Sequence, residues 1–536
     1  MAREADADPD VVVVGAGHNG LICAAYLARA GVRTTVVEAR TFTGGCSASE
    51  NFQGARVNLC NCDHVVVRSL PLIEDLGLAA HGLRYLDLRP AQVAMSWSDD
   101  RPAVLFADPE ETLASLAVTQ PDQVAGYRRY LADALPVARL VLDLAQRPPT
   151  ASTAARALSA RRGRGLARLL QWSRRPVSAV LREYFTSETL LGAAVATGPA
   201  VWGVSPHLPG TGLGALRFAL LHVIGPGRPV GGSGALTDAV LAAFEQAGGT
   251  LLADSPVGSL LVERQRVVGV RLRDGREIRA RRVVVACDPR RALLEWLNPS
   301  PPSADRLLAR WRGQPVLDGY ESKIDAIVDA APQLAAFDDT LMGRLGVSAA
   351  ELAASTTVVS PTVDAIAAAH RRSEAGGVVA DEPILMMNVP SLIDATVKAP
   401  GGGHVFSLEA LFTPFALLGG WPASAEPARW LSVASRHYRT PLTDGMRHWR
   451  AMTPDVYDRD LGMPRGFAPS FAGGPLAALL GTTPELTRYR TPIEGLFLTG
   501  AGTFPGAGVW GAPGRNTARV LLHDLNRAGT AGEGVT

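Results

Sequence analysis

Apolar residues fall along the chain in two kinds of run. Nearly uninterrupted runs lie at residues 10–14, 34–37, 283–286 and 495–499. Such runs are typical of parallel strands that are buried on both faces. Runs that alternate between apolar and polar residues lie at 260–264, 267–273 and 277–279. Asp274-Gly275 stands between the last two and is a hairpin signal. The pattern therefore predicts a buried parallel sheet with a half-exposed β-meander beside it.

A glycine-rich turn follows the first of these strands. Residues 15–20, GAGHNG, match the pattern GxGxxG, and a helical pattern follows. In such turns the first glycine permits the tight bend, the second lets a pyrophosphate approach the backbone, and the third allows the helix to pack on the strand. The helix N-terminus would offer unpaired N–H groups to phosphate. The turn therefore predicts a phosphate-binding site.

The second strand ends at Glu38, about 20 residues after the turn, where dinucleotide-binding folds place an acid. Its carboxylate can accept hydrogen bonds from both hydroxyls of an adenosine ribose. Arg40 and the pair Gly44-Gly45 extend the unit past this acid. That extension is similar to a flavoprotein pattern, whereas a plain NAD domain would continue into another strand–helix unit. We therefore expect a dinucleotide site for FAD.

The far end of the chain carries a second strand, glycine loop and helix. The strand 495–499 leads into Gly500-Ala501-Gly502, and a helical pattern follows from about Asn516, with Pro513 in a place that suits a first helical turn. Upstream, residues 231–234 read Gly-Gly-Ser-Gly and introduce a helical run at 235–244. Such distant units predict a split domain that holds one cofactor from both ends of the sequence.

These motifs together resemble the FAD-dependent oxidoreductases of the phytoene desaturase and amine oxidase superfamily, and most closely their phytoene-dehydrogenase-like branch. The matching pieces are VVVVGAGHNGL, VVEAR…GG, PVGGSGALTDAV, the meander, and TPIEGLFLTGAGTFPGAGVWGAPGRN. The resemblance implies an α/β fold, with a Rossmann-like FAD-binding domain of the GR2 type and its β-meander interleaved with a mixed α+β substrate domain. It implies that FAD contacts Gly15, Ala16, Gly17, Asn19, Gly20, Glu38, Ala39, Arg40, Gly44, Gly45, Cys46, Val257, Gly500, Ala501, Gly502, Gly508, Val509 and Trp510.

Three positions depart from the family pattern. Cys46 stands where many relatives carry an arginine after the glycine pair, Phe504 replaces a frequent histidine, and Trp510 is large for a position near flavin. FAD binding is still expected despite these departures. They argue against assigning the carotenoid reaction of the phytoene desaturases directly to this chain.

The expected chemistry is hydride transfer from a mostly apolar small molecule to flavin, which leaves a C=C or C=N bond or a carbonyl. Oxygen, a quinone or another acceptor would reoxidise the cofactor. The resemblance places residues 58–70 near the flavin ring, with Asn61, Asp63 and His64 as polar members. His64 is the candidate general base, or else a structural histidine. Trp510 is a candidate wall of the catalytic pocket, or else core. An isomerase without net oxidation and a non-catalytic flavin-binding protein are the alternatives.

Length and composition limit the other classes of function. The 536 residues predict at least two domains. We expect an FAD-binding domain of residues 1–75, 228–300 and 485–536, and a substrate-binding domain of residues 76–227 and 301–484. The net charge of +2 gives no field that would recruit nucleic acid. Five cysteines without framework spacing favour a reducing compartment, and no metal-ligand spacing is present.

Two further features concern location and partners. The polar, acidic N-terminal segment MAREADADPD lacks the pattern of a signal peptide, so a cytoplasmic location is expected. Apolar stretches at 211–225 and 405–421 are each interrupted by polar residues or proline, and predict buried core, a hydrophobic substrate wall or a membrane-dipping surface. Residues 155–185 hold eight arginines before a single acid, Glu183. They predict a solvated helix face, or a basic surface that meets anionic lipid or an acidic carrier protein.

Overall fold

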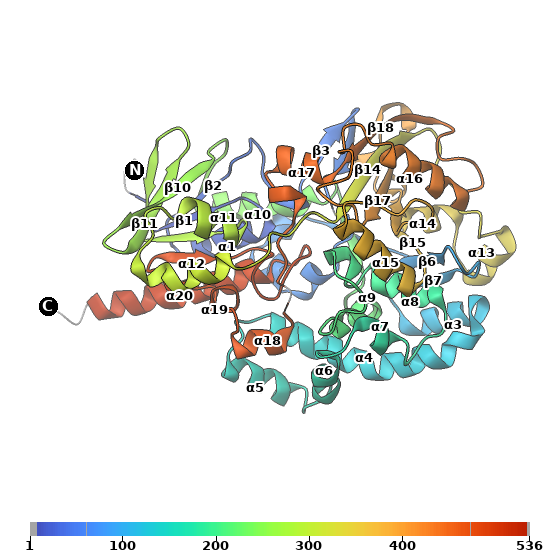
Figure 1. Cartoon of the computed structure of the whole chain (residues 1–536), viewed down its shortest axis with the longest axis horizontal. Coiled ribbons are helices and arrows are strands. Elements are labelled where there is room, and N and C mark those ends of the chain that lie inside the picture. Colours follow the sequence, from blue (N-terminus) through green and yellow to red (C-terminus); the bar gives the residue numbers. More distant parts are fainter. Residues whose placement is uncertain (1–7, 61, 472, 533–536) are drawn as a thin grey trace.

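The computed structural model describes residues 8–60, 62–471 and 473–532. Two expectations fall partly outside this range, because residues 1–7 of the N-terminal segment and Asn61 are not among the described residues. The two ends of the chain, blue and red in Figure 1, lie together in one half of the molecule. A second sheet forms the other half, and a layer of helices lies beneath it (Figure 1).

The first half contains a parallel sheet of five strands in the order β19-β13-β1-β2-β9. Its strands are β1 (Val11–Val14), β2 (Thr34–Val37), β9 (Thr250–Leu252), β13 (Arg282–Val285) and β19 (Leu496–Leu498). Four of the five were predicted from their solid apolar runs. Strand β9 was missed, because it is only three residues long and Thr250 at its start is exposed.

Alternate valines of β1 face the two sides of this sheet. Val11 and Val13 belong to a core with three helices, whereas Val12 and Val14 pack with the meander. The helices are α1 (His18–Arg29), α10 (Gly234–Gln246) and α20 (Ala512–Gly532). The meander consists of β10 (Val257–Glu263), β11 (Arg266–Leu272) and β12 (Glu277–Arg279). The predicted meander and its turn at Asp274-Gly275 are therefore confirmed.

The second half is built on a mixed sheet of seven strands in the order β18-β14-β17-β16-β15-β6-β7. Its strands are β6 (Gln92–Ser96), β7 (Ala103–Leu105), β14 (Glu321–Val328), β15 (Thr357–Ser360), β16 (Leu385–Asn388), β17 (His404–Leu411) and β18 (Met446–Met452). Only β15 and β6 run parallel. All of these strands fall in the two segments expected for the substrate-binding domain. The exact domain boundaries stay predictions.

Helices cover the apolar face of this sheet and fill the space below it. Residues of α13 (Asp339–Leu345), α14 (Ala349–Ala354) and α16 (Glu426–Ala434) pack on the apolar face. The lower layer has its own aromatic core. Its helices are α3 (Pro109–Thr119), α4 (Val124–Ala145), α5 (Ala151–Ala160), α6 (Leu166–Trp172), α7 (Val177–Leu181), α8 (Glu188–Ala196) and α9 (Arg217–Ile224), and α15 (Val363–Glu374) packs on them. No helix in the described part of the chain combines the length and apolar character needed to cross a membrane.

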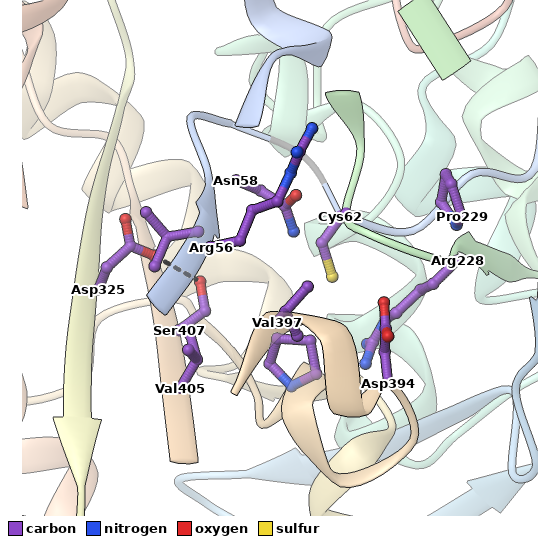
Figure 2. Close-up of a pocket in the computed structure, with 13 residues that line it drawn as sticks. Arg56, Asn58, Cys62, Arg228, Pro229, Asp325, Asp394, Val397, Val405 and Ser407 are labelled. Atoms are coloured by element: carbon purple, nitrogen blue, oxygen red, sulfur yellow. Dashed lines mark hydrogen bonds between the residues drawn. The ribbon is translucent and has the colours of Figure 1, made fainter. Parts of the chain in front are cut away.

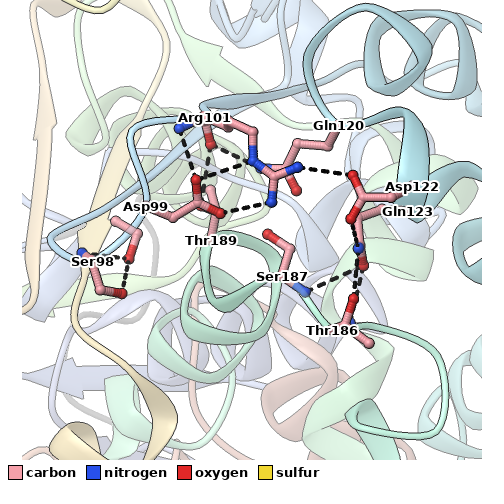
Figure 3. A network of polar contacts seen from close by, with 10 residues as sticks. Ser98, Asp99, Arg101, Gln120, Asp122, Gln123, Thr186, Ser187 and Thr189 are labelled. Carbon is pink, nitrogen blue, oxygen red and sulfur yellow. Dashed lines mark hydrogen bonds and ion pairs between the residues drawn. The ribbon is translucent and has the colours of Figure 1, made fainter.

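A polar network fixes the helical layer to the edge of the sheet (Figure 3). The carbonyl of Arg101, in the segment between β7 and the preceding strand, accepts hydrogen bonds from Gln120 at 2.8 Å and from Thr189 of α8 at 3.2 Å. The Arg101 guanidinium donates to the Asp122 carboxylate at 2.9 Å. The side-chain oxygen Oε1 of Gln123 accepts a hydrogen bond from the backbone N–H of Thr186 at 3.0 Å. These contacts satisfy polar groups that the packing of α8 would otherwise bury unpaired.

The remaining short elements connect the two halves. Strands β3 (Ser49–Phe52) and β4 (Ala55–Asn58) form a hairpin, and β5 (Tyr85–Asp87) pairs with β8 (Gly227–Pro229). The other short helices are α2 (Leu72–Asp75), α11 (Pro289–Arg291), α12 (Asp305–Arg312), α17 (Pro454–Leu461), α18 (Pro475–Leu480) and α19 (Pro484–Thr487).

Candidate functional site

The glycine turn stands at the carboxyl end of β1 and runs directly into α1. Gly15 has φ +102°, a conformation that L side chains rarely adopt. A Cβ on Gly20 would lie 2.0 Å from the Gly15 carbonyl oxygen, so only glycine lets α1 approach the strand. The structure therefore shows, in its own contacts, two of the three reasons for this spacing of glycines.

The Gly44-Gly45 turn lies against this first turn. Gly44 bridges to Gly17, and its N–H donates to the Ala16 carbonyl at 2.9 Å. A Cβ on Gly45 would come within 3.1 Å of the Gly17 Cα, whereas a Cβ on Gly17 would meet nothing closer than 3.8 Å. The two backbones thus form a cradle in which no side chain stands between them. Such a cradle suits a pyrophosphate.

Glu38 is tied to the same turn. Its carboxylate accepts hydrogen bonds from the Ala16 N–H at 2.7 Å and from the Arg40 N–H at 3.0 Å, and the residue is 7% exposed. Nε of Arg40 also donates to this carboxylate at 3.4 Å, so about one of its four acceptor positions remains for another donor. Nη1 of Arg40 is buried without a hydrogen-bond partner among the described residues. The acid predicted to bind the ribose and an unpartnered guanidinium nitrogen therefore lie side by side.

The C-terminal loop reaches the same place from the other end of the chain. Gly15 and Gly500 both lie against Ala286, so the carboxyl ends of β1, β13 and β19 meet at one edge of the sheet. Farther along, the Gly514 N–H at the start of α20 donates to the Asn19 side chain at 3.4 Å. The predicted helix with Pro513 in its first turn is confirmed, because α20 begins at Ala512.

The stretch Gly508-Val509-Trp510 faces the substrate-binding half. A Cβ on Gly508 would lie 3.7 Å from the Trp202 ring and 3.8 Å from Val66. Val66 belongs to the segment expected to pass near the flavin. Nε1 of Trp510 is buried without a partner among the described residues, so it is free to donate to a ligand. Its role as a pocket wall stays a prediction.

His64 is fully buried, and both of its ring nitrogens have protein partners. Nδ1 lies 2.9 Å from the Tyr85 hydroxyl, and Nε2 lies 2.7 Å from the Ser233 hydroxyl. Burial lowers the pKa of His64 to about 3, with a further contribution from His18. His64 is therefore neutral near pH 7 and has no nitrogen free for a substrate. Its role as a general base stays a prediction, and these contacts favour a positioning role.

His18 lies inside the glycine turn and was not singled out from the sequence. Burial lowers its pKa to about 4, although a hydrogen bond with the Gly508 backbone opposes the shift. Because this histidine is an ordinary variable position of GxGxxG, no sequence signal marked it. It links the first glycine turn to the C-terminal loop.

The remaining predicted cofactor residues lie along the same edge. Val257 opens β10, and the chain just before it runs beside Glu38, because the Ser255 N–H donates to the Glu38 carbonyl at 2.8 Å. Cys46 follows the glycine pair, and its Sγ lies 3.6 Å from the Met463 sulfur. Ala39, Ala501, Gly502 and Val509 continue the segments that the preceding paragraphs place at this edge.

Sequence reasoning missed a polar face on the seven-stranded sheet. The register pairs Lys323 with Glu409 and Asp325 with Ser407 across β14 and β17. Residues two apart along a strand share a face, so Glu321 joins this group. The signal was present as polar residues at every second position, but the partner strands lie about 80 residues apart in the sequence.

The β3–β4 hairpin and the chain around it cover this polar face. Lys323 Nζ donates to the Asn58 carbonyl at 2.9 Å and forms a buried ion pair with Asp325. Figure 2 shows the neighbouring pocket, in which Asp325 and Ser407 lie across from Cys62 and Arg228. Its free volume is about 10 Å³, the room that a single water needs. This pocket is therefore too small to be the substrate site.

A second buried ion pair lies beside this pocket. Arg228 donates to Asp63 at 2.6 Å, and the two side chains are 3% and 13% exposed. Burial opposes ionisation of Asp63, but the charge of Arg228 overcomes this effect and lowers the pKa of the carboxyl.

Among the described residues, no group of His, Cys, Asp and Glu side chains is placed to hold a metal ion.

The fold and the glycine cradle define an FAD-dependent oxidoreductase, and comparison with known proteins agrees. Residues 20–317, more than half of the chain, match the family of flavin containing amine oxidoreductases. The chain belongs to this family. The cradle between Gly17 and Gly45 and the unpartnered nitrogen of Arg40 fit FAD, which supplies hydride acceptance when bound.

Similar proteins span nearly the whole chain. Pyridine nucleotide-disulfide oxidoreductase domain-containing protein 2 of Rattus norvegicus is 29% identical over 96% of this chain and 94% of its own length. A lycopene-forming phytoene desaturase of Pseudescherichia vulneris is 26% identical over 96% and 99%. Cyclohexylamine oxidase from Brevibacterium oxydans has the same fold, with a TM-score of 0.58, 15% identity, and coverage of 97% and 100%. The resemblance stated from the sequence is confirmed.

Proposed function

We propose that this protein removes a hydride from a mostly apolar small molecule by means of FAD, in a desaturation or in a C–N or C–O oxidation. The observation that carries the proposal is the meeting of the two glycine regions, because both ends of the chain converge on one cradle. Beside it, Gly508 contacts Trp202 and Val66, and Trp202 is 36% exposed. These apolar groups are suited to an apolar substrate.

The names of similar proteins support the same range of reactions. They include a desaturase that acts on phytoene and an oxidase that acts on cyclohexylamine. Oxygen, a quinone or another acceptor would take the electrons from the cofactor. In this proposal the residues of the cradle hold the dinucleotide, Trp510 borders the pocket, and His64 holds the segment 58–70 in place through Tyr85 and Ser233.

Anaerobic mixing of the flavin-loaded protein with candidate substrates tests the proposal. The panel would hold terpenoid hydrocarbons, alcohols and amines of matched size, and the readout is flavin absorbance. Stoichiometric bleaching by a member of the panel supports oxidation. Product without net bleaching supports the alternative, an isomerase in which flavin cycles. Neither result across the panel supports a non-catalytic flavin-binding protein and contradicts the proposal.

We also propose that the basic stretch 155–185 docks the protein on an anionic surface of the cytoplasm. Four of its eight arginines have acidic partners, which supports a folded and solvated face: Arg161, Arg168, Arg175 and Arg182. The described residues show no ion pair for Arg156, Arg162, Arg164 or Arg174. All four are exposed, so their charge is available to anionic lipid or to an acidic carrier protein.

A further inference from the structure

Two carboxyl groups of the polar sheet face lie diagonally across neighbouring strands. Glu321 stands opposite Leu411, and Glu409 stands opposite Lys323, so the two acids are two positions apart on one face. Diagonal neighbours of this kind are within reach of long side chains. The opposite face of the same strands is apolar and packs on α13, α14 and α16. The register therefore brings the two acids together on the side that residues 46–60 cover.

The two carboxyl groups contact each other and find few other partners. Their side chains lie at hydrogen-bond distance, which requires one of them to hold a proton. No described N–H or O–H group donates to either carboxyl. Burial raises the pKa of Glu321 well above its usual value, and the neighbouring Glu409 charge adds to the shift. Burial also raises the pKa of Glu409. Two acids in such contact do not readily ionise together, so the contact favours a proton shared between them.

The charges around the pair act on Glu409 in opposite directions, because Lys323 lowers its pKa and Asp63 raises it. Lys323 lies across from Glu409 and stabilises its charge. Cys46, which directly follows the Gly44-Gly45 turn, is close enough to Glu321 for its charge to raise the pKa of that carboxyl. The pair therefore interacts with the segment that follows the turn. The other titratable and charged groups that face it are Cys60, Asp63, Tyr320, Asp325 and Tyr457.

We propose that Glu321 and Glu409 form a proton-sharing pair that takes up the proton accompanying flavin reduction. This inference rests on the proposed function, because in turnover the substrate supplies that proton. Both ring nitrogens of His64 already have hydroxyl partners, which favours the pair over His64 for this part. In this proposal one carboxyl of the pair is the proton acceptor, and the charge of Cys46, next to the cofactor turn, links the pair to that region.

The step balances as follows. The substrate loses two hydrogens, one as a hydride that carries both electrons and one as a proton. The hydride goes to the flavin, and the proton goes to the carboxylate of the pair, which then holds two protons. When an external acceptor takes the two electrons, the hydrogen that arrived as a hydride is released as a proton, and the pair returns its second proton to solvent, so both hydrogens lost by the substrate leave as protons. The net charge of the pair therefore rises by one when the cofactor is reduced and falls by one when the cofactor is reoxidised.

Reductive titration of the flavin-loaded protein with dithionite tests the pair without any substrate. The midpoint potential of the flavin is measured across the neutral pH range in the wild type and in the Glu321→Gln/Glu409→Gln double variant. If the pair takes up one proton, each pH unit changes the reduction equilibrium of the wild type by an additional factor of ten. For a two-electron couple this is about 30 mV per pH unit. The double variant loses this additional dependence.

Single variants and a control make the result specific. Glutamine keeps the size of each side chain. The melting temperature and flavin absorbance of Glu321→Gln, of Glu409→Gln and of the double variant check that each protein is folded and loaded with flavin. Glu50→Gln removes a neighbouring carboxyl that pairs with Arg450 at 2.6 Å, outside the pair. It should leave the pH dependence unchanged. Equal slopes in the wild type and the double variant would overturn the proposal.

The outcomes separate this inference from the proposed function. Different slopes together with an unreactive substrate panel would support the pair and contradict the proposed oxidation. Equal slopes together with bleaching by a substrate would overturn the pair and leave the oxidation standing. A protein that binds no flavin would contradict both.

Discussion

The glycine cradle and the polar face of the seven-stranded sheet differ in what their side chains do. The cradle depends on the absence of side chains, and the sheet face depends on pairs of charged side chains. In the cradle, side chains are removed so that backbone can approach a dinucleotide, as the contacts of Gly17 and Gly45 show. On the sheet face, charged side chains are buried and must neutralise one another, as Lys323 and Asp325 do. In the first region an added atom either collides with backbone, as at Gly20, or occupies the space left for the ligand, as at Gly17. The second tolerates no lost partner, because an uncompensated buried charge is costly.

Loss of one partner of the buried ion pair next to the polar sheet face should have the largest effect on stability. Asp63→Asn leaves Arg228 buried without its counter-charge, so we expect the free energy of unfolding to fall by about 4 kcal/mol. The wild type should lose the same contribution as the pH falls. The pKa of Asp63 is lowered on folding, so its stabilisation is present above the unfolded pKa and disappears as the pH falls through the folded value.

Denaturant unfolding at neutral and acid pH measures both effects. Asp238→Asn is the control, because Asp238 forms an exposed ion pair with Arg56 at 3.0 Å, and such pairs contribute little. An Asp63→Asn variant as stable as the wild type at neutral pH would contradict the assigned role of the buried pair.

An added methyl group in the cradle should separate folding from cofactor binding. Gly20→Ala places a Cβ 2.0 Å from a backbone oxygen, so we expect a loss of about 3 kcal/mol in stability. Gly17→Ala meets nothing within 3.8 Å, so the apoprotein should keep its melting temperature. Its methyl group stands where the pyrophosphate would approach, and its affinity for FAD should fall.

Thermal melting of both variants without FAD measures their stability, and the increase in melting temperature on adding FAD compares their affinity for the cofactor. Equal FAD affinity in Gly17→Ala and the wild type would show that the backbone between the two turns is not the pyrophosphate site.

Much of the first region could be predicted from the sequence, because its requirements are local. The turn requires glycines at positions 15, 17 and 20, and these glycines are visible in the sequence as a motif. The acid Glu38 follows the turn at the distance typical of dinucleotide-binding folds. The strands beside it are solid apolar runs. The exception is β9, whose three residues carry too little pattern. The C-terminal loop was predicted in kind, but only the structure shows its contacts with Asn19 and His18.

The second region could not be predicted, because its chemistry depends on pairing between distant strands. Glu321 and Glu409 become neighbours only through the register of β14 and β17. The apolar stretch 405–421 contains β17, and its apolar positions are core while Ser407 and Glu409 face the other side. His64 was expected near the site, but its partners Tyr85 and Ser233 come from remote segments.

Replacement of the buried histidine should affect structure more than chemistry. His64→Ala leaves the Tyr85 and Ser233 hydroxyls without their partner, so we expect a loss of about 2 kcal/mol in stability. Because His64 is neutral near pH 7, the pH dependence of flavin reduction should not change. Rapid-mixing measurements with a bleaching substrate would check this, and a loss of one ionisation from the profile would restore His64 as the base.

The smallest effect on stability is expected at the basic stretch, far from both regions. Reversal of Arg156, Arg162 and Arg164 to glutamate changes exposed side chains only, so the melting temperature and the turnover of a free soluble substrate should stay the same. Binding to vesicles with anionic lipid, measured by co-sedimentation, should be lost. A matched reversal of Arg271, Arg273 and Arg276 on the meander is the control. Undiminished sedimentation of the first variant would reject docking through residues 155–185.

Flavin stoichiometry tests the central claim, that both ends of the chain clasp a single FAD, most directly. Calorimetric titration of apoprotein with FAD, followed by a visible spectrum, would compare the wild type with Gly17→Ala and with Gly508→Val in the C-terminal loop. We predict one FAD per wild-type chain, a yellow protein, and weaker binding in both variants. A wild-type protein that stays colourless in excess FAD would contradict the account.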